Sequence, residues 1–137
     1  MRTISVIATA ALVITGLLTS NIASAQQPGI KRTDFPAHDL SVPGHEASQV
    51  LVEFAPGASF PKHSHPGEEL VYVVEGTLEY ALDGRAPAAL KAGDVLFIPA
   101  GTPHAVRNVG TTKATELGTY IVEKGKPLLV LSKAGAK

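Results

Sequence analysis

Hydrophobic and polar residues alternate with a period of two along most of the chain from Leu40 onward. Successive side chains of a β-strand point to opposite faces, so this pattern predicts strands rather than helices. The predicted strands, separated by turns rich in Gly and Pro, cover residues 49–54, 69–74, 78–82, 88–91, 94–98, 104–109 and 114–123. A last apolar run covers 127–131. Many short strands in a chain of this size indicate an all-β barrel or sandwich.

The first 25 residues have the layout of a secretory signal peptide. Met1-Arg2 gives a positive start, residues 4–18 are apolar and uncharged, and Ala23-Ser24-Ala25 offers small residues for cleavage. An apolar run of this length is shorter than the ~17–25 residues that span a bilayer. We therefore expect cleavage after Ala25, a periplasmic or secreted protein, and no membrane attachment afterwards. In the mature chain we expect a mobile lead-in over 26–36 and one barrel domain over 37–137.

Composition narrows the range of partners. The 137 residues include 12 basic and 12 acidic side chains, and this balance argues against nucleic acid as the main partner. The absence of cysteine excludes disulfides, thiolate metal sites and a cysteine nucleophile. A small-molecule substrate or ligand remains the expected partner.

Three histidines and one glutamate have the chemistry and spacing of metal ligands. His63 and His65 are two residues apart and can share one face of a strand. Glu69 opens the next strand and is expected opposite this pair in a hairpin, while His104 is expected to complete the set from across a barrel. Three imidazoles and one carboxylate suit a divalent transition metal, with Mn, Fe, Co, Ni, Cu and Zn all open. A half-filled octahedron would leave positions for water or substrate.

The spacing around these residues resembles the two signature motifs of the cupin superfamily. The first, G-x5-H-x-H-x3-E-x6-G, covers 57–76, and the second, G-x5-P-x-G-x2-H-x3-N, covers 93–108. The resemblance implies a double-stranded β-helix, or jelly-roll barrel, of two antiparallel sheets. It also implies that His63, His65, Glu69 and His104 bind one metal inside the barrel. Small cupins often pair through their sheets, so a homodimer is expected, with 127–131 as an edge strand or interface.

Residues near the motifs fall into three groups. Asn108 lies four residues after His104 on the same strand face, where we expect it to support the site or the strand end by hydrogen bonding rather than to bind metal. Candidates for lining a pocket are Phe60, Tyr80, Phe97 and Tyr120. Polar residues expected outside the site are His38, His45, Glu68 and Arg107.

Three functions fit this site. The first is an exported metal-dependent dioxygenase of a small organic substrate, in which Glu69 could double as a proton acceptor. The second is a metal-assisted isomerase or lyase, and the third is a non-catalytic protein that holds a metal or small ligand. No further histidine lies in the motif region, which favours chemistry by the metal itself or none. Export of an unfolded chain would expose the site to Cu and Zn, so we expect a variable metal.

Overall fold

The computed structural model describes residues 27–132, which form eleven β-strands and no helix. The strands are β1 (Ile30–Asp34), β2 (His38–Asp39), β3 (His45–Phe54), β4 (Ser59–Ser64), β5 (Glu68–Glu75), β6 (Thr77–Leu82), β7 (Ala88–Lys91), β8 (Val95–Ile98), β9 (His104–Asn108), β10 (Ala114–Glu123) and β11 (Val130–Leu131). This part of the chain contains no helix long and apolar enough to cross a membrane. The signal peptide predicted over 1–25 lies outside the described residues.

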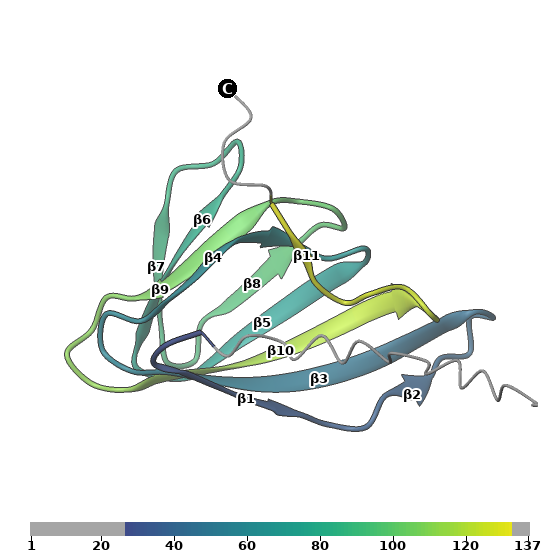
Figure 1. Cartoon of the computed structure of the whole chain (residues 1–137), viewed down its shortest axis with the longest axis horizontal. Helices are drawn as coiled ribbons and strands as arrows, with labels where there is room; N and C mark the ends of the chain where they lie inside the picture. The colour runs from purple at the N-terminus through teal and green to yellow at the C-terminus, as the bar shows by residue number, and fades with distance from the viewer. Residues whose placement is uncertain (1–26, 133–137) are drawn as a thin grey trace, which may run out of the picture.

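The strands form two antiparallel sheets that face each other (Figure 1). The six-stranded sheet has the order β1-β3-β10-β5-β8, with β2 beside β3, and the five-stranded sheet has the order β11-β4-β9-β6-β7. Neighbours in space are mostly distant in sequence, as a jelly roll requires. The predicted all-β double-stranded β-helix of two antiparallel sheets is confirmed.

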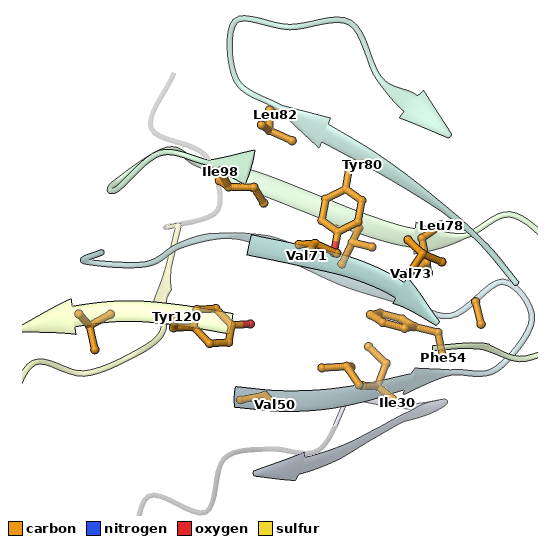
Figure 2. Packing of buried hydrophobic residues seen from close by; sticks show 14 residues of the cluster. Ile30, Val50, Phe54, Val71, Val73, Leu78, Tyr80, Leu82, Ile98 and Tyr120 are labelled. Atoms are coloured by element: carbon orange, nitrogen blue, oxygen red, sulfur yellow. The ribbon is translucent and has the colours of Figure 1, made fainter. Parts of the chain in front are cut away.

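The core lies between the two sheets (Figure 2). On β5, Val71 and Val73 point inward and are buried, whereas the alternating Leu70, Tyr72 and Val74 are exposed on the outer face. The same alternation operates on β3, β6 and β10. The period-two pattern of the sequence therefore reports one buried and one outer face for each strand.

The barrel begins earlier than the sequence suggested. Within the expected lead-in over 26–36, residues Ile30–Asp34 form β1 and pair with β3 over five positions. Only Ile30 of this strand is buried, so its side chains carry almost no hydrophobic pattern. Its place in the sheet is determined by backbone pairing with β3. The expected start of the barrel domain at residue 37 is therefore too late, because β1 already belongs to the six-stranded sheet. At the other end, the predicted edge strand appears as β11, which pairs with β4 within its own sheet.

Candidate metal centre

Strands β4 and β9 place two of the histidines side by side. His63 and His104 are direct partners in the register of this antiparallel pair, and their ring centroids are 4.2 Å apart. His65 follows the end of β4, with its ring centroid 4.9 Å from that of His63. Its carbonyl accepts a 2.8 Å hydrogen bond from the backbone N–H of Gly101, in the turn before β9. The two sequence motifs are thus joined by backbone as well as by side chains.

Glu69 reaches the histidines from the opposite sheet. The prediction that β4 and β5 form a hairpin is wrong, because the chain crosses between the sheets after His65 and Glu69 then lies on β5. The expected place of His104 is wrong too, since it is a neighbour of His63 in one sheet. At Gly67 an added Cβ would lie 1.9 Å from the carbonyl oxygen of Ile121, so the crossing needs a residue without a side chain. This close approach lets the chain enter β5 with Glu69 facing inward.

The three imidazoles are held in one tautomer by backbone carbonyls. Each Nδ1 lies within hydrogen-bond distance of a carbonyl oxygen: His63 with Pro61 at 2.8 Å, His65 with Leu128 at 2.6 Å, and His104 with Thr102 at 2.9 Å. A carbonyl only accepts, so each Nδ1 carries the hydrogen and each Nε2 presents a lone pair. Fixing the outer nitrogen in this way orients the inner nitrogen as a metal ligand.

The charge state of the group also suits a cation. Burial alone would raise the pKa of Glu69, but its contacts with His104 and His65 lower that pKa to about 2, so the carboxylate is ionised. Burial lowers the pKa of His63 to about 4, against the favourable carbonyl of Pro61, so this ring is neutral. An ionised carboxylate beside a neutral imidazole has the protonation state that metal binding requires.

Two buried atoms at this site lack hydrogen-bond partners. Glu69 Oε2 lies 3.2 Å from His65 Nε2 and 3.3 Å from His104 Nε2, and all three side chains are almost fully buried. These contacts place one carboxylate oxygen beside two imidazole nitrogens. Both His65 Nε2 and Glu69 Oε2 are buried without a partner. Such groups are costly unless something satisfies them, and a divalent cation would do so.

The structure brings all four sequence-predicted residues together. Ring nitrogens of His63, His65 and His104 lie within 4.8 Å of one another, and the group could hold a metal ion. Glu69 adds an oxygen next to two of these nitrogens. Three nitrogens and one carboxylate oxygen are compatible with several first-row metals and select none of them.

The donors open into a cavity of about 220 Å³. Its walls include three of the four aromatic residues proposed from the sequence, namely Phe60, Tyr80 and Tyr120. The fourth, Phe97, is 53% exposed on the outer face of β8, so its assignment to the pocket is wrong. Strand alternation explains this error, because Ile98 takes the inward position next to it and is buried. The remaining walls combine the apolar Ile30, Val52, Phe54, Val106 and Leu129 with the polar Gln27, Arg32 and Glu116.

Glu116 is a cavity residue that the sequence analysis missed. It lies on β10, is 4% exposed, and accepts a hydrogen bond from the hydroxyl of Tyr80 on β6. Burial raises the pKa of Glu116 to about 8, although the Tyr80 hydrogen bond opposes the shift. Glu116 is therefore a candidate acid or base outside the motif region, in which the sequence offered no further histidine. The available signal was a carboxyl four residues before Tyr120, at an inward position of an apolar strand.

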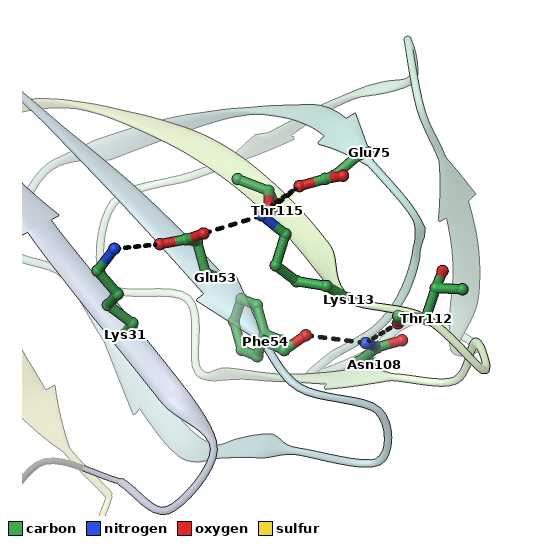
Figure 3. Close-up of polar contacts among 8 residues, drawn as sticks. All are labelled: Lys31, Glu53, Phe54, Glu75, Asn108, Thr112, Lys113 and Thr115. Carbon is green, nitrogen blue, oxygen red and sulfur yellow. Dashed lines mark hydrogen bonds and ion pairs between the residues drawn. The ribbon is translucent and has the colours of Figure 1, made fainter.

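Asn108 has the structural role expected for it. Its Nδ2 donates to the carbonyl oxygens of Phe54 at 3.0 Å and Thr112 at 2.8 Å (Figure 3). Its Oδ1 accepts from Gly110 N–H at 2.9 Å. These bonds join the end of β9 to β3 and to the turn before β10. None of the polar residues expected outside lines the cavity: Arg107 and His38 are exposed, and Glu68 and His45 are half-buried.

The fold and the donor group define the class: a jelly-roll barrel with a buried histidine cluster that could hold a metal. Residues 50–127 match the Cupin domain family, and the chain belongs to that family. It is 39% identical over 57 residues to dimethylsulfoniopropionate lyase DddQ of Ruegeria pomeroyi, covering 42% of this chain and 28% of that protein. It is 31% identical over 107 residues to germin-like protein subfamily 2 member 1 of Arabidopsis thaliana, covering 69% and 49%.

Solved structures give the same result. The crystal structure of DddQ from Ruegeria pomeroyi superposes with a TM-score of 0.59 at 27% identity, covering 66% of this chain and 45% of that one. A recombinant oxalate oxidase in complex with glycolate gives a TM-score of 0.62 at 26% identity, covering 80% and 57%. The chain spans about half or less of the length of the two curated relatives.

Proposed function

We propose that the protein binds one divalent transition metal through His63, His65, His104 and Glu69, and acts with it on a small organic molecule in the cavity. The observation that carries this proposal is the pair of buried, partnerless atoms, Glu69 Oε2 and His65 Nε2, beside imidazoles whose outer nitrogens are fixed. A metal bound there would supply open coordination positions and Lewis acidity to an oxygen-bearing ligand.

Oxygenation of the substrate is the first reaction class. Three histidines and one carboxylate leave room on an octahedral metal for both a ligand and dioxygen. A solved relative at 26% identity is an oxalate oxidase with bound glycolate, a small molecule rich in oxygen donors. In this reaction class Glu69 is also proposed as a proton acceptor.

Elimination or isomerisation is the second class, and Glu116 is the observation that favours it. Such reactions move protons, and the Glu116–Tyr80 pair offers a protonated carboxyl in the same cavity as the metal ligands. The relative DddQ is named as a lyase. Glu116 is thus a candidate for the group that transfers a proton in such a reaction.

Parallel assays separate these classes. Metal-loaded protein is given catechols, flavonols and diketones in an oxygen electrode, and the same molecules with sugars and oxoacids under anaerobic conditions with product analysis. Oxygen uptake supports oxygenation, and anaerobic turnover supports elimination or isomerisation. His104→Ala should abolish either activity. Tight metal uptake with no turnover in both panels would identify a non-catalytic binding protein, and failure of the wild type to take up metal would overturn the proposal.

We also propose export with cleavage after Ala25, and a metal content that varies between Cu and Zn. Intact-mass measurement on protein secreted by the producing cell checks the cleavage. Elemental analysis of the same material checks the metal, and uniform iron would count against the second point.

We further propose a homodimer formed through the outer face of the six-stranded sheet. Neighbouring strands β5 and β8 present a row of exposed apolar residues there: Leu70, Tyr72, Val74, Val95 and Phe97. In the register, Leu70 pairs with Phe97 and Tyr72 with Val95, so these side chains form one contiguous patch. Sedimentation equilibrium of the wild type and Phe97→Glu tests this, with a monomeric variant expected. A monomeric wild type would contradict it.

A further inference from the structure

Besides the metal ligands, the cavity wall carries the polar side chains of Gln27, Arg32 and Tyr120 and the Glu116–Tyr80 pair. Glu116 on β10 and Tyr80 on β6 meet from opposite sheets, and both line the cavity. Within residues 27–132, Tyr80 is the only hydrogen-bond partner of the Glu116 side chain, and no Lys, Arg or His forms an ion pair with its carboxyl. By contrast, Glu53 on the surface pairs with both Lys31 and Lys113 (Figure 3). A buried carboxyl with a single neutral partner has unused hydrogen-bonding capacity.

The backbone of Glu116 lies farther along the barrel than that of Glu69, although the ring centroid of its partner Tyr80 is 6.4 Å from that of His104. In the register with β5, Tyr120 lies opposite Glu69, and Glu116 lies four residues farther along β10. At ~3.3 Å per residue, this is about 13 Å along the strand. Gly118 lies between them, and a Cβ there would meet the Tyr120 hydroxyl oxygen at 2.8 Å. The Tyr120 ring therefore lies along the strand over Gly118, and the cavity wall runs from Glu69 past Tyr120 to Glu116.

The proton of Glu116 is available to the cavity. Burial, which does not depend on a bound metal, raises the pKa of Glu116 and favours its protonated form. Oε2 already accepts from the Tyr80 hydroxyl. A protonated carboxyl has one O–H donor, which the other oxygen can present to a ligand.

We propose that Glu116, positioned by Tyr80, donates a hydrogen bond to the far end of a ligand whose near end binds the metal. The cavity of about 220 Å³ takes a molecule of roughly a dozen non-hydrogen atoms. Its chemical class follows from the two ends: an oxygen chelator at one end and a neutral acceptor oxygen, such as a carbonyl, at the other. The inference rests on the proposed metal site and is independent of the reaction class.

Calorimetric titration of the Zn²⁺-loaded protein tests this contact, because Zn²⁺ has no redox chemistry to consume the probe. The probes are 3,4-dihydroxybenzaldehyde, a catechol with a carbonyl at its far end, and 4-methylcatechol, which lacks the acceptor. Glu116→Leu should weaken binding of the aldehyde about tenfold and change binding of 4-methylcatechol less than about twofold. Glu116→Gln keeps an N–H donor and should recover most of the aldehyde affinity.

Two controls separate a ligand contact from a change in cavity shape or folding. Val52 lines the cavity and pairs with Glu116 in the β3–β10 register, so Val52→Ala should alter both affinities by a similar factor. Tyr80→Phe removes the hydroxyl that positions Glu116 and should weaken only the aldehyde, about threefold, which tests the contact even if Glu116→Leu does not fold.

The outcomes are distinct. The assignment of Glu116 is overturned if Glu116→Leu loses the same factor of affinity for both probes. It is also overturned if neither Glu116→Leu nor Tyr80→Phe weakens binding of the aldehyde. In both cases Zn²⁺ binding by the wild type still stands. A wild type that takes up no Zn²⁺ overturns the proposed function and this inference with it.

Discussion

Strand β9 has two buried polar residues on one face, His104 and Asn108, and each is 1% exposed. Every polar atom of the Asn108 side chain is used: Nδ2 donates twice and Oδ1 accepts once. Four residues away, the group around His104 includes Glu69 Oε2 and His65 Nε2, which have no partner. One strand thus connects a saturated polar cluster with an unsaturated one.

This difference separates a structural polar residue from the residues proposed to bind the metal. A buried amide that makes all its hydrogen bonds stabilises the fold and has no capacity left for a ligand. A buried carboxylate and an imidazole nitrogen without partners keep that capacity, and they are costly until something binds. Burial alone does not separate the two residues, because both are almost fully covered. Hydrogen-bond saturation does.

The largest predicted effect is the loss of metal binding in His104→Ala. Removing one of three imidazoles should weaken Zn²⁺ affinity by more than about 100-fold, because the remaining donors cannot complete the site. Titration against a competing chelator measures this. Asn108→Ala is the matched control on the same face of the same strand, and its Zn²⁺ stoichiometry should remain that of the wild type. Equal affinities for wild type and His104→Ala would remove His104 from the site.

The second prediction concerns stability, where Asn108→Ala should lower the free energy of unfolding more than His104→Ala does. Asn108→Ala leaves two carbonyls and one N–H without their partner, so we expect the free energy of unfolding to fall by about 2–4 kcal/mol. Urea unfolding of the metal-free protein measures this loss. A change below about 1 kcal/mol would show that water replaces Asn108 readily and that the two ends of β9 do not differ as described.

A third prediction concerns pH, where Glu116 and Glu69 act in opposite directions. The pKa of Glu116 is about 8 in the folded protein, above its ordinary 4.5, so its contribution to stability is complete below about 4.5 and is lost as pH rises to about 8. The pKa of Glu69 is about 2, so its contribution is present above 4.5 and is lost as pH falls towards 2.

Metal-free wild type and Glu116→Gln isolate the first of these effects. Between pH 5 and 8 the wild type should lose more than about 1 kcal/mol of unfolding free energy relative to the variant. Thermal unfolding at several pH values measures the difference. A constant difference over this range would mean that Glu116 is ionised throughout.

The smallest effect is expected at the surface ion pairs of Lys113. Its Nζ lies 2.9 Å from Glu53 and 2.8 Å from Glu75, and all three side chains are accessible to solvent. Lys113→Ala should lower the melting temperature by only ~1–2 °C at low salt, with no effect on metal binding. In about 1 M NaCl the difference should vanish, because exposed charges are screened. A larger loss that persists in salt would contradict a purely surface role.

Local patterns predicted much of the fold and the four residues that the structure brings together at the candidate site. The strand over 114–123 matches β10, because alternation there is strong, and the two motifs contain all four donor residues within short stretches of sequence. The sheet to which each strand belongs was not predictable in this way. Alternation places Glu69 on an inward face, but it does not reveal that the chain crosses between sheets after His65.

Residues defined by distant partners were missed for the same reason. β1 has one buried side chain and is held by backbone pairing with β3, which leaves no pattern in its own sequence. Glu116 accepts a hydrogen bond from Tyr80, which is 36 residues away in sequence and lies on the other sheet. No local sequence pattern therefore indicates that the two residues are in contact. Phe97 was misplaced because a short apolar strand gives little indication of which face is buried.

The most direct test of the central claim is anomalous diffraction from crystals of the Zn²⁺-loaded protein, recorded on both sides of the zinc absorption edge. We expect one peak inside the barrel, about 2.0–2.2 Å from an Nε2 of each of His63, His65 and His104 and from a carboxylate oxygen of Glu69. A peak elsewhere, or full metal occupancy with these imidazoles turned away from it, would contradict the account.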